Sequence, residues 1–287
     1  MISLRHLLCC IIAVAGLTSH NAAAHGLRPA GEAEKLGYSP GDTVLVIPAS
    51  VRPLPPFCFA GCDDLVRVTF ADGSQCSEIG EFCFAECTAL RRITLPPSLR
   101  VMGEGMLREC RALENLTVPS GVPALPKELC LRCSSLENIS MPPHLREIGS
   151  FALAGCMKLE KLELPSTVTK IGSNAFSDCA SLTEAAVPAD VTLLESYAFS
   201  GCTSLRSLTL PARRDMLGEL MVSGCTSLMQ ITEPSPAPPD FDCGSYLFDP
   251  DDEAAYSRCV LRVPAGREAA YSDAHAWGLF RHILPID

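Results

Sequence analysis

The chain has 287 residues, of which 47% are hydrophobic and 20% charged; this apolar content excludes a wholly disordered chain, which lacks the surface to offset its ordering entropy. Acidic residues outnumber basic ones by 33 to 23, and the net charge of −10 excludes attraction to nucleic-acid phosphates through an overall basic surface. Aromatic residues make up only 6% of the chain, with a single Trp, which disfavours a carbohydrate platform of stacked rings.

Residues 1–24 have the three-part pattern of a secretory signal peptide. A short basic start is followed by an apolar run over 7–16 and by an alanine triplet that ends at Ala24. The run of about ten residues is too short to span a membrane, which takes roughly twenty. We therefore expect export to the cell surface, the periplasm or the medium, no transmembrane segment in the mature chain, and a flank over 25–43.

One period organises most of the remaining chain. Cysteines recur every 23 residues from Cys87 to Cys225, and Cys62 precedes the first of them by 25. A leucine stands three residues after each cysteine, and internal repetition of this length predicts a solenoid whose coils cover one another. The repeat residues expected in the core are Cys87, Cys110, Cys133, Cys156, Cys179, Cys202, Cys225, Leu90, Leu113, Leu136, Leu159, Leu182 and Leu205.

Each repeat predicts a short strand that ends at a proline. Apolar residues six and eight places after the cysteine alternate with polar ones, which is typical of a half-buried strand, and a proline follows in seven of eight repeats. Segment 44–48 has the strand and proline without the cysteine, so 44–233 is expected to contain one degenerate coil and eight repeats of 23–25 residues. Ser173 is placed to cap a short helix in one return segment.

Two further segments follow the repeats. Residues 234–258 are rich in proline and acidic residues and are expected to be an irregular insertion. Residues 259–287 regain the strand-then-proline pattern and are predicted to form a cap, because a terminal coil has no neighbour to cover its core. Trp277, Phe280 and Ile283 are the residues suited to close that end.

The repeat columns resemble the BspA-like (Treponema-type) leucine-rich repeat, whose unit reads C-x-x-L-x-x-I-x-L-P-x-x-[IV]-x-x-I-G-x-x-A-F-x-x. The copies over 156–178 and 179–201 match best, and the resemblance covers 44–233. It implies an α/β fold, a right-handed leucine-rich-repeat solenoid with a curved parallel sheet on the concave face, short helical or irregular returns on the convex face, and the C-terminal capping element of that family. The chain departs from the pattern at Met106, Leu107, Pro126, Leu129, Cys130, Met221 and Val222.

The periodic cysteines are interpreted as buried packing residues, because cysteine packs as a small apolar side chain. Export to an oxidising compartment stands against free thiols unless burial protects them. No metal and no cofactor are predicted. The alternatives left open are a zinc site on Cys58, Cys62, Cys83 and Cys87, and disulfides Cys58–Cys83 and Cys243–Cys259.

No catalytic motif stands out in the sequence: a phosphate-binding glycine loop, a nucleophile elbow and a helical zinc-hydrolase motif are all missing. Glu163 and Glu184 on adjacent coils form the one suggestive carboxylate pair, which gives a secreted glycan hydrolase as the alternative function. The acidic stretch Asp249–Glu253 is interpreted as a solvated loop, since calcium ligands need a wider spacing. The chain is therefore predicted not to be an enzyme.

The outward strand positions, five and seven residues after each cysteine, are where a solenoid of this kind is expected to meet a partner. Arg67 and Arg92 make one end of this surface basic, which either orients a partner with an acidic end or simply keeps the chain soluble. The resemblance implies an exported binding or adhesion protein with a protein, cell-surface or extracellular-matrix ligand; a purely structural module is a third possibility. The expected contact residues are Arg67, Thr69, Arg92, Thr94, Asn115, Thr117, Asn138, Ser140, Lys161, Glu163, Glu184, Ser207, Thr209 and Gln230.

Overall fold

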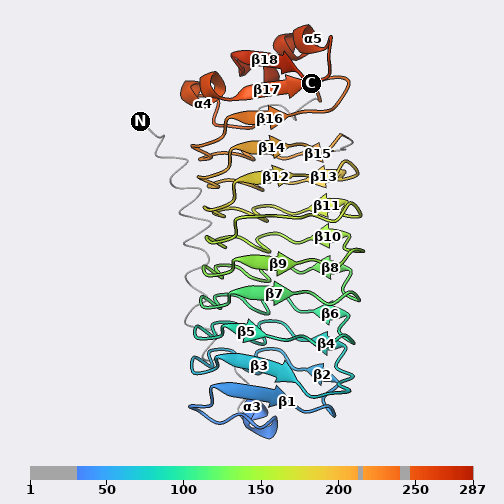
Figure 1. Cartoon of the computed structure of the whole chain (residues 1–287), viewed down its shortest axis with the longest axis vertical. Coiled ribbons are helices and arrows are strands. Elements are labelled where there is room, and N and C mark those ends of the chain that lie inside the picture. Colours follow the sequence, from blue (N-terminus) through green and yellow to red (C-terminus); the bar gives the residue numbers. More distant parts are fainter. Residues whose placement is uncertain (1–30, 213–215, 240–245, 287) are drawn as a thin grey trace.

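The computed structural model describes residues 31–212, 216–239 and 246–286 and shows a column of stacked coils (Figure 1). The short helix α3 (Glu32–Lys35) lies at one end, and the helices of the C-terminal segment lie at the other. The proposed signal segment 1–24 and Cys243 lie outside the described residues. The predicted parallel-strand solenoid is confirmed, with about ten turns and little helix.

A first row of parallel strands runs along the column. The strands form two five-stranded sheets, and within each sheet a strand pairs in register with the next, as Asn115 does with Asn138, so that outward side chains stack above one another. We call the outward side of this row the strand face. Its strands are β1 (Val44–Ile47), β3 (Arg67–Phe70), β5 (Arg92–Ile93), β7 (Asn115–Thr117), β9 (Asn138–Ser140), β12 (Glu184–Ala186), β14 (Ser207–Thr209), β16 (Gln230–Thr232), β17 (Val260–Val263) and β18 (His282–Pro285).

A second row of two-residue strands follows the proline of each repeat. This row is broken between the strand at 101–102 and the strand at 124–125. The cause is that Pro123 and Pro126 have no N–H at positions that elsewhere donate to the preceding coil, as Gly149 does to the Leu125 carbonyl at 2.9 Å. The departure from the repeat pattern at Pro126 thus has a visible structural effect. The strands are β2 (Pro53–Leu54), β4 (Glu78–Ile79), β6 (Val101–Met102), β8 (Ala124–Leu125), β10 (Glu147–Ile148), β11 (Lys170–Ile171), β13 (Leu193–Leu194) and β15 (Met216–Leu217).

The return segments take the irregular form, as a row of hydrogen-bonded turns. Phe151 and Gly155 each donate a backbone N–H to the next coil, at 2.9 and 2.8 Å. Residues five and one places before each cysteine have a left-handed backbone, for example Asn174 and Asp178 with φ of 57°, which a right-handed helix does not allow. The helix that Ser173 was expected to cap therefore does not form.

The core runs unbroken along the column between these three rows. All the cysteines and leucines predicted to be internal are buried, with at most 2% of any side chain exposed. The thiols also donate hydrogen bonds: Cys87 Sγ lies 3.1 Å from the carbonyl oxygen of Phe59 in the preceding coil, and Cys179 Sγ lies 3.4 Å from that of Leu153. Cysteine therefore supplies both packing volume and a weak bond between coils, of which the sequence predicted only the packing.

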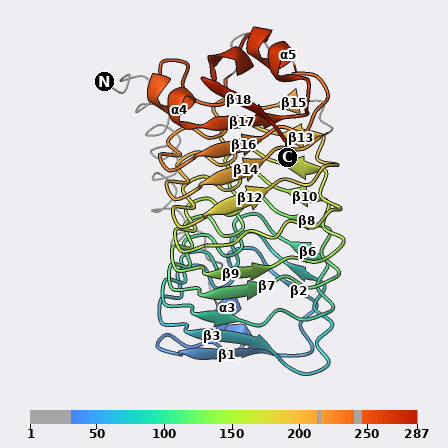
Figure 2. The same cartoon turned by 45° about the horizontal axis from the view of Figure 1, so that its top comes forward.

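The C-terminal segment covers the last coil (Figure 2). It contains α4 (Glu253–Arg258), α5 (Glu268–Asp273) and the 3-10 helix η1 (Trp277–Leu279). Trp277 is 1% exposed and donates its indole N–H to the Pro239 carbonyl at 3.1 Å, while Phe280 is buried and Ile283 half-buried beside it. The acidic stretch is a largely exposed loop over 249–252 that leads into α4, and Asp252 caps the helix by accepting the Ala255 N–H.

Candidate binding surfaces

The residues predicted to contact a partner all lie on the strand face. Each is exposed or half-buried, and the residues between them point inward, as the two-residue period of a strand requires. Asn138 also donates its side-chain amide to the Asn115 carboxamide oxygen at 3.0 Å, so these two side chains are held in a ladder. The face is therefore polar, with side chains spaced by about 4.8 Å from coil to coil.

The N-terminal end of the strand face is both basic and apolar. Arg67 and Arg92 are exposed register partners, and Val44 and Val46 occupy the same outward columns on β1 with 54% of each side chain exposed. Neighbouring Arg91 forms an ion pair of 3.5 Å with Glu114. This end thus offers two positive charges beside two bare aliphatic side chains, a combination suited to an acidic partner with an apolar contact.

The strand face is interrupted by a cleft that we call the seam, the space between residues 137–141 and 160–164. The ladder of the first row stops at β9 and resumes with a bridge from Lys161 to Glu184. Two hollows of about 320 and 450 Å³ follow the seam, the first beside Asn138 and Lys161 and the second beside Ser140 and Glu163. These four predicted contact residues therefore line the two edges of the cleft.

A third hollow, the turn groove, lies over the turn row of five coils and has a volume of about 690 Å³. Gly155 and Gly201 leave space along it because they carry no side chain, and Met157 contributes an exposed apolar wall. Burial at Asp178 raises the pKa of its carboxyl group, while Arg132 acts in the opposite direction. The groove therefore combines an apolar lining with a partly desolvated carboxylate.

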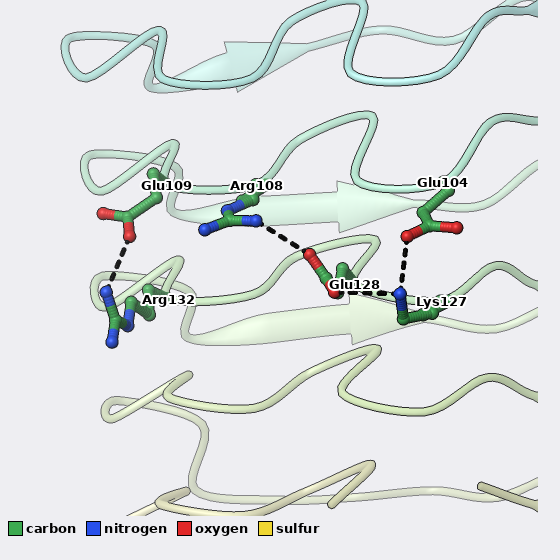
Figure 3. Close-up of polar contacts among 6 residues, drawn as sticks. All are labelled: Glu104, Arg108, Glu109, Lys127, Glu128 and Arg132. Carbon is green, nitrogen blue, oxygen red and sulfur yellow. Dashed lines mark hydrogen bonds and ion pairs between the residues drawn. The ribbon is translucent and has the colours of Figure 1, made fainter. Parts of the chain in front are cut away.

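A cluster of charged side chains closes one end of the turn groove (Figure 3). Glu109, which is 1% exposed, accepts from Arg132 at 3.0 Å and from Arg111 at 2.7 Å. Nearby, Arg108 and Glu128 form a buried ion pair of 2.9 Å, and Glu128 also pairs with Lys127 at 3.3 Å. A buried charge is tolerated only when it is paired, so this cluster fixes the shape of the groove end.

The thiols that the structure describes are free and buried. Burial raises the pKa of Cys179 and of Cys225 to about 12, so both are neutral at physiological pH. Cys58 and Cys83 are not joined in a disulfide in this structure, and Cys259 is likewise a thiol. Among residues 31–212, 216–239 and 246–286, no three His, Cys, Asp or Glu side chains are grouped to hold a metal ion.

The two carboxylates considered for a glycan hydrolase are exposed to solvent. Glu163 and Glu184 are both exposed on the strand face, and Glu184 pairs in register with Lys161 rather than with Glu163. Neither sits in an enclosed site that would exclude water from a reaction. Neither this geometry nor the comparisons below support a hydrolase.

The stacked strands, the buried cysteine–leucine columns and the open polar face define a leucine-rich-repeat solenoid. A family model described as the BspA type leucine rich repeat region matches residues 42–134 and 124–238 in six copies, and the chain belongs to this family. Proteins with such repeats commonly serve in binding or adhesion, are typically non-enzymatic and are typically found on bacterial cell surfaces. No curated protein matches the chain.

Several solved structures are similar. The leucine-rich-repeat protein of Treponema pallidum is 25% identical over 71% of this chain and 80% of its own, with a TM-score of 0.43. A leucine-rich cell surface protein from Faecalibacterium prausnitzii is 18% identical, covering 85% and 79%, with a TM-score of 0.36. The pneumococcal vaccine antigen PcpA is 17% identical, covering 85% and 79%, with a TM-score of 0.35. No helix within the described ranges is long and apolar enough to cross a membrane.

Sequence analysis did not find the turn groove, its charge cluster or the seam. The cluster had a signal: Arg108 stands two residues before its cysteine, where the other repeats have Ala, Leu or Ser, and it directly follows the departures at Met106 and Leu107. Glu160, Lys161 and Glu163 likewise put three charges into one strand segment, more than any other repeat has there. Charge at such positions disfavours regular strand pairing.

Proposed function

We propose that this chain is an exported, non-catalytic binding protein that holds a protein, cell-surface or extracellular-matrix ligand on its strand face. One observation carries the proposal: the outward side chains of the first row are exposed or half-buried and, on each side of the seam, are stacked in register on a hydrogen-bonded scaffold. A face ordered in this way pays little conformational entropy on binding, and a stack of repeats presents an extended surface to one partner. Family membership supports the same function.

The basic end of the strand face sets the orientation of the partner in this proposal. Arg67 and Arg92 attract an acidic region, while Val44 and Val46 bury apolar area against it. Binding that depends on such exposed charges weakens as salt is raised.

Capture of the mature protein on an array of extracellular proteins and glycans tests this function. In the double variant Arg67→Glu with Arg92→Glu, we expect capture to fall by about tenfold or more and its salt dependence to decrease, since each reversed contact costs on the order of 1 kcal/mol. The matched control is Arg146→Glu with Lys170→Glu, two exposed basic residues of the second row. Equal loss in both double variants, or no loss in either, would contradict the proposal.

A further inference from the structure

The seam is a place where a regular backbone hydrogen bond is missing. In neighbouring coils, the residue five places after the cysteine donates its N–H to the preceding coil, as Asn138 does to the Glu114 carbonyl at 3.4 Å and Gln230 to that of Arg206 at 3.1 Å. The equivalent bond would join Lys161 to the Glu137 carbonyl. Neither it nor any other backbone hydrogen bond joins 137–141 to 160–164, all of which the structure describes. The row of strands in Figure 1 is interrupted at the same place.

The seam differs in kind from the break in the second row. There, Pro123 and Pro126 have no N–H to donate, so the missing bonds follow from the sequence. Residues 137–141 and 160–164 contain no proline and keep a complete set of backbone donors and acceptors. Two unpaired strand edges therefore face each other across the seam, and an edge of this kind is a template for a further strand.

The inward side chains at the seam are also less covered than those elsewhere. Ile139, Met141 and Leu164 are only partly buried. By comparison, Leu116 in the column of Ile139 is 2% exposed, and Leu210 in the column of Met141 and Leu164 is 1% exposed. The hollow of about 450 Å³ contacts all three of these partly buried side chains as well as Glu163. An occupant of the seam thus meets apolar side chains on its inner side and a carboxylate at the outer rim.

We propose that the seam binds an extended peptide segment of a partner protein, which completes the first row as an added strand between β9 and Lys161–Glu163. The proposal rests on the proposed function, because the seam lies on the strand face. An extended peptide fits the chemistry, since its N–H and C=O groups pair with both edges and its alternate side chains cover Ile139 and Leu164. A basic residue in the segment then lies beside Glu163. The charges of Glu160, Lys161 and Glu163 keep other strands out, as charges on sheet edges do.

Hydrogen exchange of the free protein tests the open edges directly. We expect the amides of Lys161 and Glu163 to exchange as exposed groups, while those of Leu116 and Leu208, within paired strands, are protected. Protection of Lys161 and Glu163 equal to that of the paired strands would show that the seam is closed in solution and would overturn the inference.

A synthetic peptide tests the occupant. The probe is acetyl-Thr-Val-Thr-Leu-Lys-amide, and the comparison probe carries N-methyl groups on the Val and Leu amides. We expect the first peptide to protect 137–141 and 160–164 from exchange, and the second to bind about tenfold more weakly or worse, because each lost hydrogen bond costs about 0.5–1.5 kcal/mol. Equal binding of the two peptides, or no protection at millimolar concentration, refutes strand addition.

A matched pair of variants locates the peptide. Glu163→Lys is expected to weaken binding of the first peptide about tenfold, and Thr209→Lys, in the same outward column of a paired strand, to leave it unchanged. An equal effect of both would place the peptide elsewhere. The seam and the proposed function fail separately: if the seam peptides do not bind while Arg67→Glu with Arg92→Glu still abolishes capture, the strand face remains the binding surface and only the seam is refuted.

Discussion

Alkaline pH is expected to unfold this protein through its buried thiols. Burial raises the pKa of Cys179, Cys225 and Cys259 to about 12 each in the folded state, against about 8.5 in an unfolded chain. Because the folded pKa is the higher one, the stability held by each neutral thiol is complete below pH of about 8.5. It is lost progressively as the pH rises toward 12, since the unfolded state releases protons first.

The size of the effect follows from the same values. At pH 9.5 each of these thiols lowers the unfolding free energy by on the order of 1 kcal/mol, and the three together by roughly 3–4 kcal/mol. The other repeat thiols whose pKa burial raises, such as Cys110 and Cys156, act in the same direction. A loss of this size is a large fraction of the roughly 5–15 kcal/mol that stabilises a typical domain.

Urea denaturation at pH 7.0, 8.5 and 9.5, with reductant and without oxygen, measures this dependence. Cys179→Ala lowers the unfolding free energy at pH 7.0 because it removes packing and a hydrogen bond. Its further decrease between pH 7.0 and 9.5 is expected to be smaller than in the unmodified protein by on the order of 1 kcal/mol. An unfolding free energy that stays constant within about 1 kcal/mol over this range would refute the argument that the thiols are buried and neutral.

Three further outcomes are expected. Leu159→Ala should lower the unfolding free energy, measured by urea titration, by about 2–5 kcal/mol, because Leu159 is fully buried. The control variant is Met157→Ala at an exposed position, which should change the unfolding free energy by less than about 0.5 kcal/mol. Arg108→Ala should lower the unfolding free energy by about 3 kcal/mol, because it breaks the buried ion pair and leaves Glu128 to the more exposed Lys127 at 3.3 Å. Arg108→Met with Glu128→Leu should recover most of that loss in a double-mutant cycle. Trp277→Ala should cost about 3–5 kcal/mol by opening the capped end of the core, seen as a lower thermal midpoint by circular dichroism.

The inward-facing half of the fold was predictable because each inward position packs in the core in the same way in every coil. A column such as Cys156 and Cys179 faces the same surroundings in every coil, so selection for packing repeats one residue type at one spacing. The strands follow from the same columns, and the prolines mark where they end. Eight copies of one pattern make the signal much stronger than any single strand would.

The return segments were harder because their backbone conformation is set by the neighbouring coil. Asn174 and Asp178 adopt a left-handed conformation that costs energy without tertiary support, and backbone hydrogen bonds to the next coil supply that support. A signal was nevertheless present: Gly155, Gly201 and Gly224 occupy the position before the cysteine in other repeats. Glycine recurring in one column indicates a positive φ rather than a helix.

The seam was not predictable from any single residue, because it depends on how far two coils stand apart. The stability of a solenoid is close to a sum of contacts between neighbouring coils, and the coils of Cys133 and Cys156 keep two of their three hydrogen-bonded rows. The second row joins Glu147 to Lys170, and the turn row joins Phe151 to Ser173. A strand bound in the seam would restore the third row between these two coils. Binding there would thus stabilise both halves of the column together, which links recognition on the strand face to the cooperativity of the whole fold.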